Sequence, residues 1–267
     1  RTQGQRILAL KRFKSGEVLA KTGVAGGFSI LNVRVDLHDG HVGVLTGSVQ
    51  DSPGRPSGTK LLEEFVRAQP WLGSRRFGGA AAIPLRRPYA RLGAPGLALL
   101  GDAGCMNFSA HGSGIAVGLR AARMLSDAVS AHSLDPGSER ATWSYASRWH
   151  QDSGGLLLAY DVVRRVTQQM SRDDLEQLMS SGLLSSASAR AALAQQVPPL
   201  GALDVISAVR AAIRNPRLAA RMARGASSVP GCLAHGKRYP VDPDLRALAE
   251  YERRGAELAA DPVGPVD

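Results

Sequence analysis

The sequence predicts an α/β protein with an antiparallel sheet in its first third and mostly helices in the remainder. Alternating β-branched residues in FSILNVRVDL (28–37), followed by an Asp39-Gly40 turn, predict paired strands. The short apolar run Leu97–Leu100 predicts a strand buried on both faces. From Ile115 onward, apolar residues recur at helical spacing.

The first third contains the strand and turn signals. Short strands are expected over residues 7–13, 17–24, 30–35 and 41–49, a helix over 59–69, and a further strand over 75–83. Ser15-Gly16 provides the first turn, and Pro70 ends the helix.

The remainder contains the helical signals. Helices are expected over residues 115–131, 139–170, 172–181, 202–214, 216–224 and 244–260, with a loop over 225–242. Gly154-Gly155 divides the second of these helices, and Ser171 with Asp174 forms a capping box for the third. The core-facing stripe of the first is expected at Ile115, Leu119, Ala122, Leu125 and Val129.

Length and cysteine usage describe an ordinary globular chain. Its 267 residues suffice for one large or two modest domains. Cys105 and Cys232 are too few for a disulfide framework, which predicts a reducing, cytoplasmic setting. No apolar run approaches the about 20 residues that span a bilayer.

The net charge of +10 is concentrated near the start of the chain. Residues 1–91 hold 15 Lys or Arg and 6 Asp or Glu, a net of +9. Basic surfaces bind nucleic acid, anionic membranes or phosphorylated substrates. No nucleic-acid module is present and aromatic residues are scarce, so no nucleic-acid partner is expected. Peripheral contact with a membrane, or a diphosphate substrate, remains as an interpretation.

The chain is organised around GDAGCMNFSAHGSGI, residues 101–115. Gly101-Asp102 ends the predicted strand, and Gly112-Ser113-Gly114 opens the helix at Ile115. A helix N-terminus offers free backbone N–H groups and a partial positive charge. Glycines permit close approach to that backbone, and a carboxylate accepts hydrogen bonds from hydroxyls. A flavin has both matching features, a polyol chain and an electron-rich carbonyl edge.

A dinucleotide fingerprint is the competing interpretation of these glycines. Gly112, Gly114 and Gly118 approximate G-x-G-x-x-G, but the last glycine is one place late. The fingerprint must follow a strand directly, whereas nine residues intervene here. The expected acidic residue, Asp135, lies in a Pro/Gly turn. We therefore reject this interpretation.

The same stretch resembles the second flavin motif of FAD-dependent reductases and monooxygenases, and most of all the geranylgeranyl reductase family. The resemblance implies a reductase/monooxygenase-like fragment, in which Asp102, beside Gly101, holds the ribityl chain of the FAD. Ser109 stands where the family has a loop proline. Backbone at the pyrimidine edge of the ring would come from Gly112, Ser113, Gly114 and Ile115.

The resemblance also implies a domain order. Residues 1–95 would form a substrate-domain sheet with one helix, and 96–133 the strand, loop and helix of the flavin motif. Residues 134–230 would form a helical region and 231–267 a tail with a surface helix. This order is that of the family, in which the chain leaves the substrate-domain sheet and then re-enters the flavin domain.

Few side chains are candidates for chemistry, because a flavin carries the redox step itself. His111 is a weak candidate proton donor, since histidine titrates near neutrality. Cys105, Met106 and Phe108 are expected in the core or a cavity wall. The histidines and cysteines show no metal-ligand spacing.

The reaction implied by the resemblance is saturation of isoprenoid C=C bonds, with NAD(P)H or another donor supplying electrons. Two alternatives are an aromatic monooxygenase of the same fold and a non-catalytic module that binds lipid or a partner. No glycine-rich βαβ unit precedes Gly96. We therefore expect the dinucleotide-binding half of the flavin site either in cis or on another chain. Residues 1–267 alone are expected to bind FAD weakly or not at all.

Overall fold

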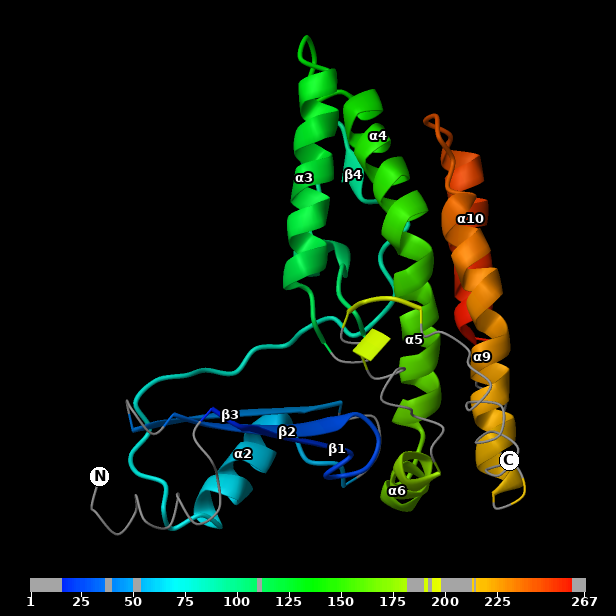
Figure 1. Ribbon diagram of the computed structural model, residues 1–267. Helices are drawn as coiled ribbons and strands as arrows, with labels where there is room; N and C mark the ends of the chain where they lie inside the picture. The colour runs from blue at the N-terminus through cyan, green and yellow to red at the C-terminus, as the bar shows by residue number, and fades with distance from the viewer. Residues whose placement is uncertain are drawn as a thin grey trace. The chain divides into compact units, whose positions relative to one another are not determined.

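A computed structural model describes residues 16–36, 40–49, 54–109, 112–181, 190–191, 194–197, 213 and 215–260. These ranges contain helices and short antiparallel strands, in agreement with a mixed α/β protein (Figure 1). The chain divides into two compact units: residues 1–82 with 167–177, and residues 83–166 with 178–267.

The first unit contains a three-stranded antiparallel sheet in the order β1-β2-β3. The strands are β1 (Val18–Thr22), β2 (Ser29–Asp36) and β3 (His41–Ser48), with Val33 of β2 opposite Leu19 and Val44. The strands predicted over 17–24, 30–35 and 41–49 are thereby confirmed. The strand predicted over 7–13 lies outside the described residues.

A small core covers one face of this sheet. Val33 and Val35 alternate inward on β2 and pack with Trp71, all buried. The helix α2 (Gly58–Arg67) begins at the N-cap Ser57, whose hydroxyl accepts a hydrogen bond from the Lys60 N–H, and it contributes Phe65 to this core. The helix predicted over 59–69 is confirmed with its end at Arg67.

The strand predicted over 75–83 is wrong. This segment contains no strand and is largely exposed, with Phe77 at 85% and Ile83 at 50% exposure. Gly78 has φ +120°, a conformation that interrupts an extended strand. The sequence RRFGGAAAI also offers no apolar alternation that a sheet could bury.

The buried strand predicted over Leu97–Leu100 is also wrong. β4 (Gly93–Ala94) and β5 (Leu97–Ala98) form a hairpin whose strands are only two residues long, and Leu97 is 56% exposed. Pro95-Gly96 returns the chain at once, with Gly96 at φ +74°, and a 3₁₀ turn, η1 (Gly101–Gly104), follows. The apolar run is therefore too short to become a central strand.

Helices make up most of the second unit (Figure 1). Its described helices are α3 (Ile115–Ala131), α4 (Glu139–Trp149), the π-helix η2 (His150–Gly154), most of α5 (Gly155–Gln168), α9 (Pro216–Lys237) and α10 (Leu245–Ala260). The helix α6 (Arg172–Ser180) belongs mostly to the first unit. The predicted division at Gly154-Gly155 is confirmed, as is the capping box, in which Ser171 and Asp174 exchange two 3.1 Å hydrogen bonds. Within the described ranges, no helix combines the length and apolar character needed to cross a bilayer.

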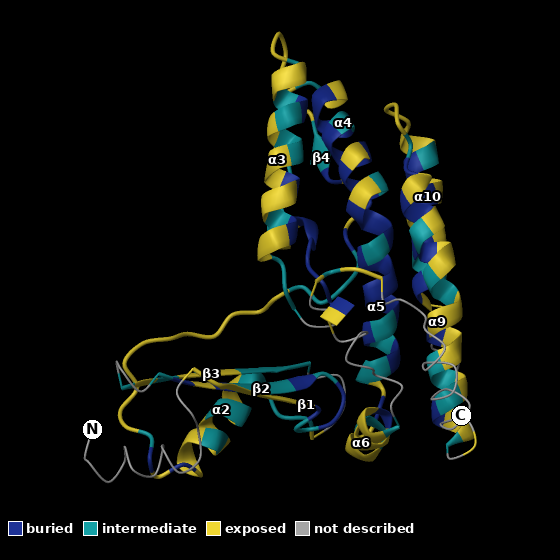
Figure 2. Cartoon of the chain, in the orientation of Figure 1, coloured by how far each residue is buried: buried dark blue, intermediate teal, exposed yellow. Residues whose placement is uncertain are grey.

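The buried face of α3 agrees with the predicted one only in part: Leu125 and Val129 are partly buried, and Leu125 packs against the core. Ile115 is 83% and Leu119 is 68% exposed, and Ala122 is exposed too. Exposed residues lie along much of α3 in Figure 2. Val117, Ala121 and Ala128 are buried instead. Both sets have helical spacing, so periodicity alone does not select between them. The packing of α4 against α3 determines which face is buried, because α4 covers the face that carries Val117, Ala121 and Ala128.

The loop predicted over 225–242 is wrong as far as Lys237, because α9 continues to that residue and passes through Pro230. An internal proline usually breaks a helix. Here Gly225, Cys232 and Gly236 are buried, so packing of α9 maintains the helix across the proline. The helix predicted over 202–214 lies almost entirely outside the described residues.

A close backbone contact in the second unit joins α9 to the junction of η2 and α5. A Cβ placed on Gly155 would lie 2.6 Å from the Cys232 carbonyl oxygen of α9. A Cβ on Gly236 would lie 2.5 Å from the Gly155 nitrogen. Both distances are far below van der Waals contact, so the two backbones touch where neither residue has a side chain. We name this contact the glycine crossing.

A cluster of four buried aromatic rings lies beside the glycine crossing. The His150 ring stacks on Tyr239 with centroids 4.5 Å apart, and the His235 ring stacks on Tyr251 at 3.9 Å. The Nε2 of His150 lies 3.1 Å from the carbonyl oxygens of Tyr89 and Ala90. This nitrogen therefore carries the proton and donates, while Nδ1 accepts from the Tyr251 hydroxyl at 3.3 Å.

Gly236→Ala is expected to lower the free energy of unfolding by about 1–3 kcal/mol, because the new methyl would meet backbone atoms that cannot rotate away. Gly231→Ala is the matched control in the same helix. Its Cβ meets only the movable Cδ2 of Leu258 at 3.3 Å, so it should be neutral or stabilising. Urea unfolding of both variants measures the difference, and equal stabilities would contradict the crossing.

The aromatic cluster predicts acid lability. Burial lowers the pKa of His150 to about 3 and that of His235 to about 4, from an ordinary 6.5. The unfolded chain therefore binds more protons as pH falls below about 6.5, and stability decreases toward pH 4. The expected loss is about 2 kcal/mol per histidine at pH 5.

Thermal unfolding measured from pH 7 to pH 4.5 tests this dependence. His235→Asn should make the curve shallower because that side chain no longer titrates. The exposed His41→Asn should leave the slope unchanged. A melting temperature constant between pH 7 and pH 5 would contradict the assignment of two buried neutral histidines.

Candidate functional site

The 3₁₀ turn η1 begins the described segment 101–109, and residues 112–114 precede α3. The Asp102 carbonyl accepts from the Cys105 N–H at 3.0 Å, and the Gly101 carbonyl accepts from the Met106 N–H at 2.9 Å. A Cβ on Gly104 would lie 2.9 Å from the Cε of Met106, so the turn rests directly on the core. The acidic turn is thus held by backbone hydrogen bonds and by a buried methionine beneath it.

A second set of backbone bonds closes the loop in front of α3. Phe108 donates to the Ser113 carbonyl at 2.9 Å, and Gly112 donates to the Phe108 carbonyl at 2.7 Å. Gly112 has φ +70°, which favours glycine. Phe108 is buried edge-on against Tyr160 of α5, with centroids 4.8 Å apart. The core position expected for Phe108 is confirmed, as are those of Met106 and Cys105.

Asp102 and the start of α3 lie close together. A Cβ on Gly114 would be 3.6 Å from the Oδ1 of Asp102, 3.2 Å from the Cβ of Asn107 and 3.4 Å from the Met106 carbonyl oxygen. η1 packs against the first turn of α3. The structure therefore brings Gly101, Asp102 and Gly114 into one place. A side chain at position 114 would narrow the space between the carboxylate and the helix.

The N-terminus of α3 has no side-chain cap. Gly114 is the N-cap residue, and the first turn contains no acidic residue. Among the described residues, no side chain at the N-cap accepts from the N–H groups of this turn, and the helix dipole adds a partial positive charge. Ile115 is 83% exposed, so this helix end is open. A carbonyl or anionic oxygen is the complementary ligand group.

Two buried polar atoms of the loop have no hydrogen-bond partner within the described residues: the Oδ1 of Asn107 and the Oγ of Ser109. Asn107 is 1% and Ser109 is 0% exposed. The amide of Asn107 donates to the Pro84 carbonyl at 2.6 Å, which orients its oxygen. An unsatisfied buried polar atom costs about 1–3 kcal/mol. A ligand with donor groups would relieve this cost.

The remaining predicted site residues have less to contribute. The Ser113 hydroxyl accepts from the Gln195 amide at 3.4 Å. His111 lies outside the described residues. Burial raises the pKa of the Cys105 thiol above its usual value, so Cys105 stays protonated and is a poor nucleophile. Asn107 was missed at the sequence level, although a lone amide between Met106 and Phe108 was a detectable signal.

The site is chemically simple. It combines the exposed Asp102 carboxylate and the helix amides that follow Gly114, with the side chain of Asn107 beside them. Such a set binds hydroxyls through the carboxylate and a polarised carbonyl through the amides. The geometry supplies positioning and electrostatics, with no nucleophile and base pair among its described side chains.

Comparison with known proteins gives one informative match. No protein-family model matches the chain. A curated relative, the digeranylgeranylglycerophospholipid reductase of Methanothrix thermoacetophila, is 32% identical over 151 residues. The match covers 54% of this chain and 37% of the relative, so the chain spans well under half of the protein that it matches. This similarity confirms the resemblance of the chain to the geranylgeranyl reductase family.

Proposed function

We propose that this chain forms the ring-edge part of a flavin-dependent reductase that saturates isoprenoid C=C bonds. The observation that carries the proposal is the convergence of the Asp102 carboxylate on the uncapped start of α3 at Gly114. The relative is, by its name, a reductase of a digeranylgeranylglycerophospholipid. That name supports an oxidoreductase and suggests an isoprenoid lipid as the substrate.

The described residues fit the isoalloxazine edge and ribityl chain of FAD. The Asp102 carboxylate would accept hydrogen bonds from ribityl hydroxyls. The amides that follow Gly114 would donate to the pyrimidine carbonyl, and the missing Cβ leaves room for close approach. The buried oxygen of Asn107 would accept from a ring N–H. When bound, a flavin would supply the hydride transfer to the substrate double bond.

The α3 N-terminus also contributes an electrostatic role. Negative charge near a helix N-terminus is stabilised by about 0.3–2 kcal/mol. The start of α3 would therefore favour the anionic form of a reduced flavin ring over its neutral form. NAD(P)H is the proposed electron donor. The remaining half of the flavin site would be supplied in cis or in trans.

Flavin binding tests the site directly. Riboflavin, FMN and FAD should bind with similar affinities, because the Asp102 carboxylate and the amides after Gly114 would contact only the ring and the ribityl chain, which all three share. Asp102→Asn should weaken each about tenfold through loss of the charged acceptor. Quenching of flavin fluorescence measures these affinities. Asp135→Asn, an exposed aspartate of the same unit, is the matched control and should change nothing.

Gly114→Val provides a second, steric variant. Its side chain would fill the space beside Asn107 and the Asp102 carboxylate, so flavin binding should be lost while circular dichroism shows retained helices. Wild-type flavin affinity in both variants would contradict the assigned site. Tight stoichiometric binding of FAD alone would show that the adenosine half is also recognised by this chain.

The reaction class has its own test. Under anaerobic conditions, the chain supplied with chemically reduced flavin should add two hydrogens per double bond to a prenyl lipid, as measured by mass spectrometry. Oxygen-dependent hydroxylation of an aromatic substrate would favour the monooxygenase instead. Saturable prenyl-lipid binding without turnover would favour a binding module.

A further inference from the structure

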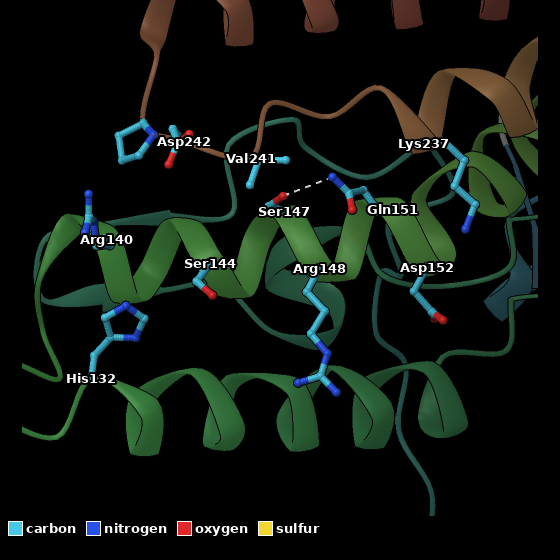
Figure 3. Close-up of a pocket in the computed structure, with 11 residues that line it drawn as sticks. His132, Arg140, Ser144, Ser147, Arg148, Gln151, Asp152, Lys237, Val241 and Asp242 are labelled. Carbon is cyan, nitrogen blue, oxygen red and sulfur yellow. Dashed lines mark hydrogen bonds between the residues drawn. The ribbon is translucent and has the colours of Figure 1, made fainter.

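A polar groove runs along α4, apart from the Asp102 site (Figure 3). Its volume is about 610 Å³, a size typical of small-molecule sites. We call it the α4 groove. It is lined by His132, Arg140, Ser144, Ser147, Arg148, Gln151, Asp152, Lys237, Val241, Asp242 and Pro243.

Two of its positive charges are not neutralised by ion pairs. Arg148 lies 3.0 Å from Asp127, and Asp152 is paired with Arg120. Arg140 and Lys237, by contrast, form no ion pair with any residue in the described ranges. Both are exposed, so they are open to a ligand from solvent.

These two cations lie at opposite ends of the groove. Arg140 is near the start of α4, whereas Lys237 is the last residue of α9 and lies near Asp152 (Figure 3). Residues 140 to 152 follow one continuous helical path, which at about 1.5 Å per residue is about 18 Å long. A single small anion cannot contact both ends.

The wall between the two ends carries the neutral groups of Ser144, Ser147 and Gln151, together with Arg148, which is paired with Asp127. Ser144, Ser147 and Gln151 lie between Arg140 and Lys237 on the same side of α4 (Figure 3). Gln151 donates to the Ser147 hydroxyl at 3.3 Å and to the Tyr239 carbonyl at 3.2 Å, which holds the amide in place. Val241 and Pro243 are the apolar residues among those that line the groove. The hydroxyl and amide groups of the wall can form hydrogen bonds with hydroxyl groups of a ligand.

We propose that the α4 groove binds a polar molecule with two separated anionic groups and hydroxyls between them, a bisphosphorylated polyol by chemical class. Arg140 pairs with one phosphoryl group and Lys237 with the other. Ser144, Ser147 and Gln151 bond the intervening hydroxyls. The Asp242 carboxylate, at the Arg140 end, opposes the ligand charge and limits affinity.

Isothermal titration with fructose 1,6-bisphosphate, fructose 6-phosphate and inorganic phosphate tests the proposal. The bisphosphate should bind about tenfold more tightly than the monophosphate, because it gains a second charge-assisted contact. Either Arg140→Ala or Lys237→Ala should abolish this preference by reducing bisphosphate affinity to the monophosphate level. Asp242→Asn should strengthen binding severalfold.

Arg224→Ala is the matched control, since it removes one exposed positive charge from α9 outside the groove. It should leave the bisphosphate preference intact. Equal losses in Arg224→Ala and Lys237→Ala would overturn the proposal, because they would indicate nonspecific attraction. Absence of saturable bisphosphate binding would also overturn it, as would binding only to phosphatidylglycerol vesicles. The groove shares no lining residue with the Asp102 site, so these results are independent of flavin binding.

Discussion

The glycine crossing is the contact on which the second unit depends. α9 reaches the η2–α5 junction so closely that the Cβ of any other residue at Gly155 or Gly236 would overlap backbone atoms. Helices normally pack 8–10 Å apart through their side chains. Contact through backbone alone demands glycine on both partners. It also fixes where α9 ends, and so places Lys237 opposite Asp152 in the α4 groove.

The π-helix next to this crossing connects the helices to the candidate site. A π-turn adds one residue to the helix and is frequent at functional sites. Here it contains His150, whose Nε2 donates to the carbonyls of Tyr89 and Ala90. The chain that contains Tyr89 and Ala90 continues to Leu92, whose side chain packs against Gly104 in the η1 turn. The buried neutral histidine thus links the helix pair to the loop that presents Asp102.

The two proposed sites of the second unit would use different chemistry. At Asp102 the proposed recognition groups are mostly backbone: helix amides, a tight turn and a glycine that leaves space. In the α4 groove they are side chains at the ends of helices, with two cations separated by hydroxyls and an amide. A backbone site tolerates little change in sequence at its glycines. A side-chain site depends on charge and can be altered without disturbing the fold.

Local chemistry in the sequence was sufficient for many features. It predicted the three strands after residue 16, the helix over 59–69, the Ser171 capping box and the division at Gly154-Gly155, because each depends on residues a few positions apart. The expectation that Asp102 and Gly114 face one ligand came from the resemblance of residues 101–115 to a flavin motif. Tertiary packing decided the rest. It buried Val117 in place of Ile115, extended α9 through Pro230 and reduced the Leu97 strand to a two-residue hairpin. The physical reason is that burial depends on which surface arrives opposite, and residues distant along the chain supply that surface.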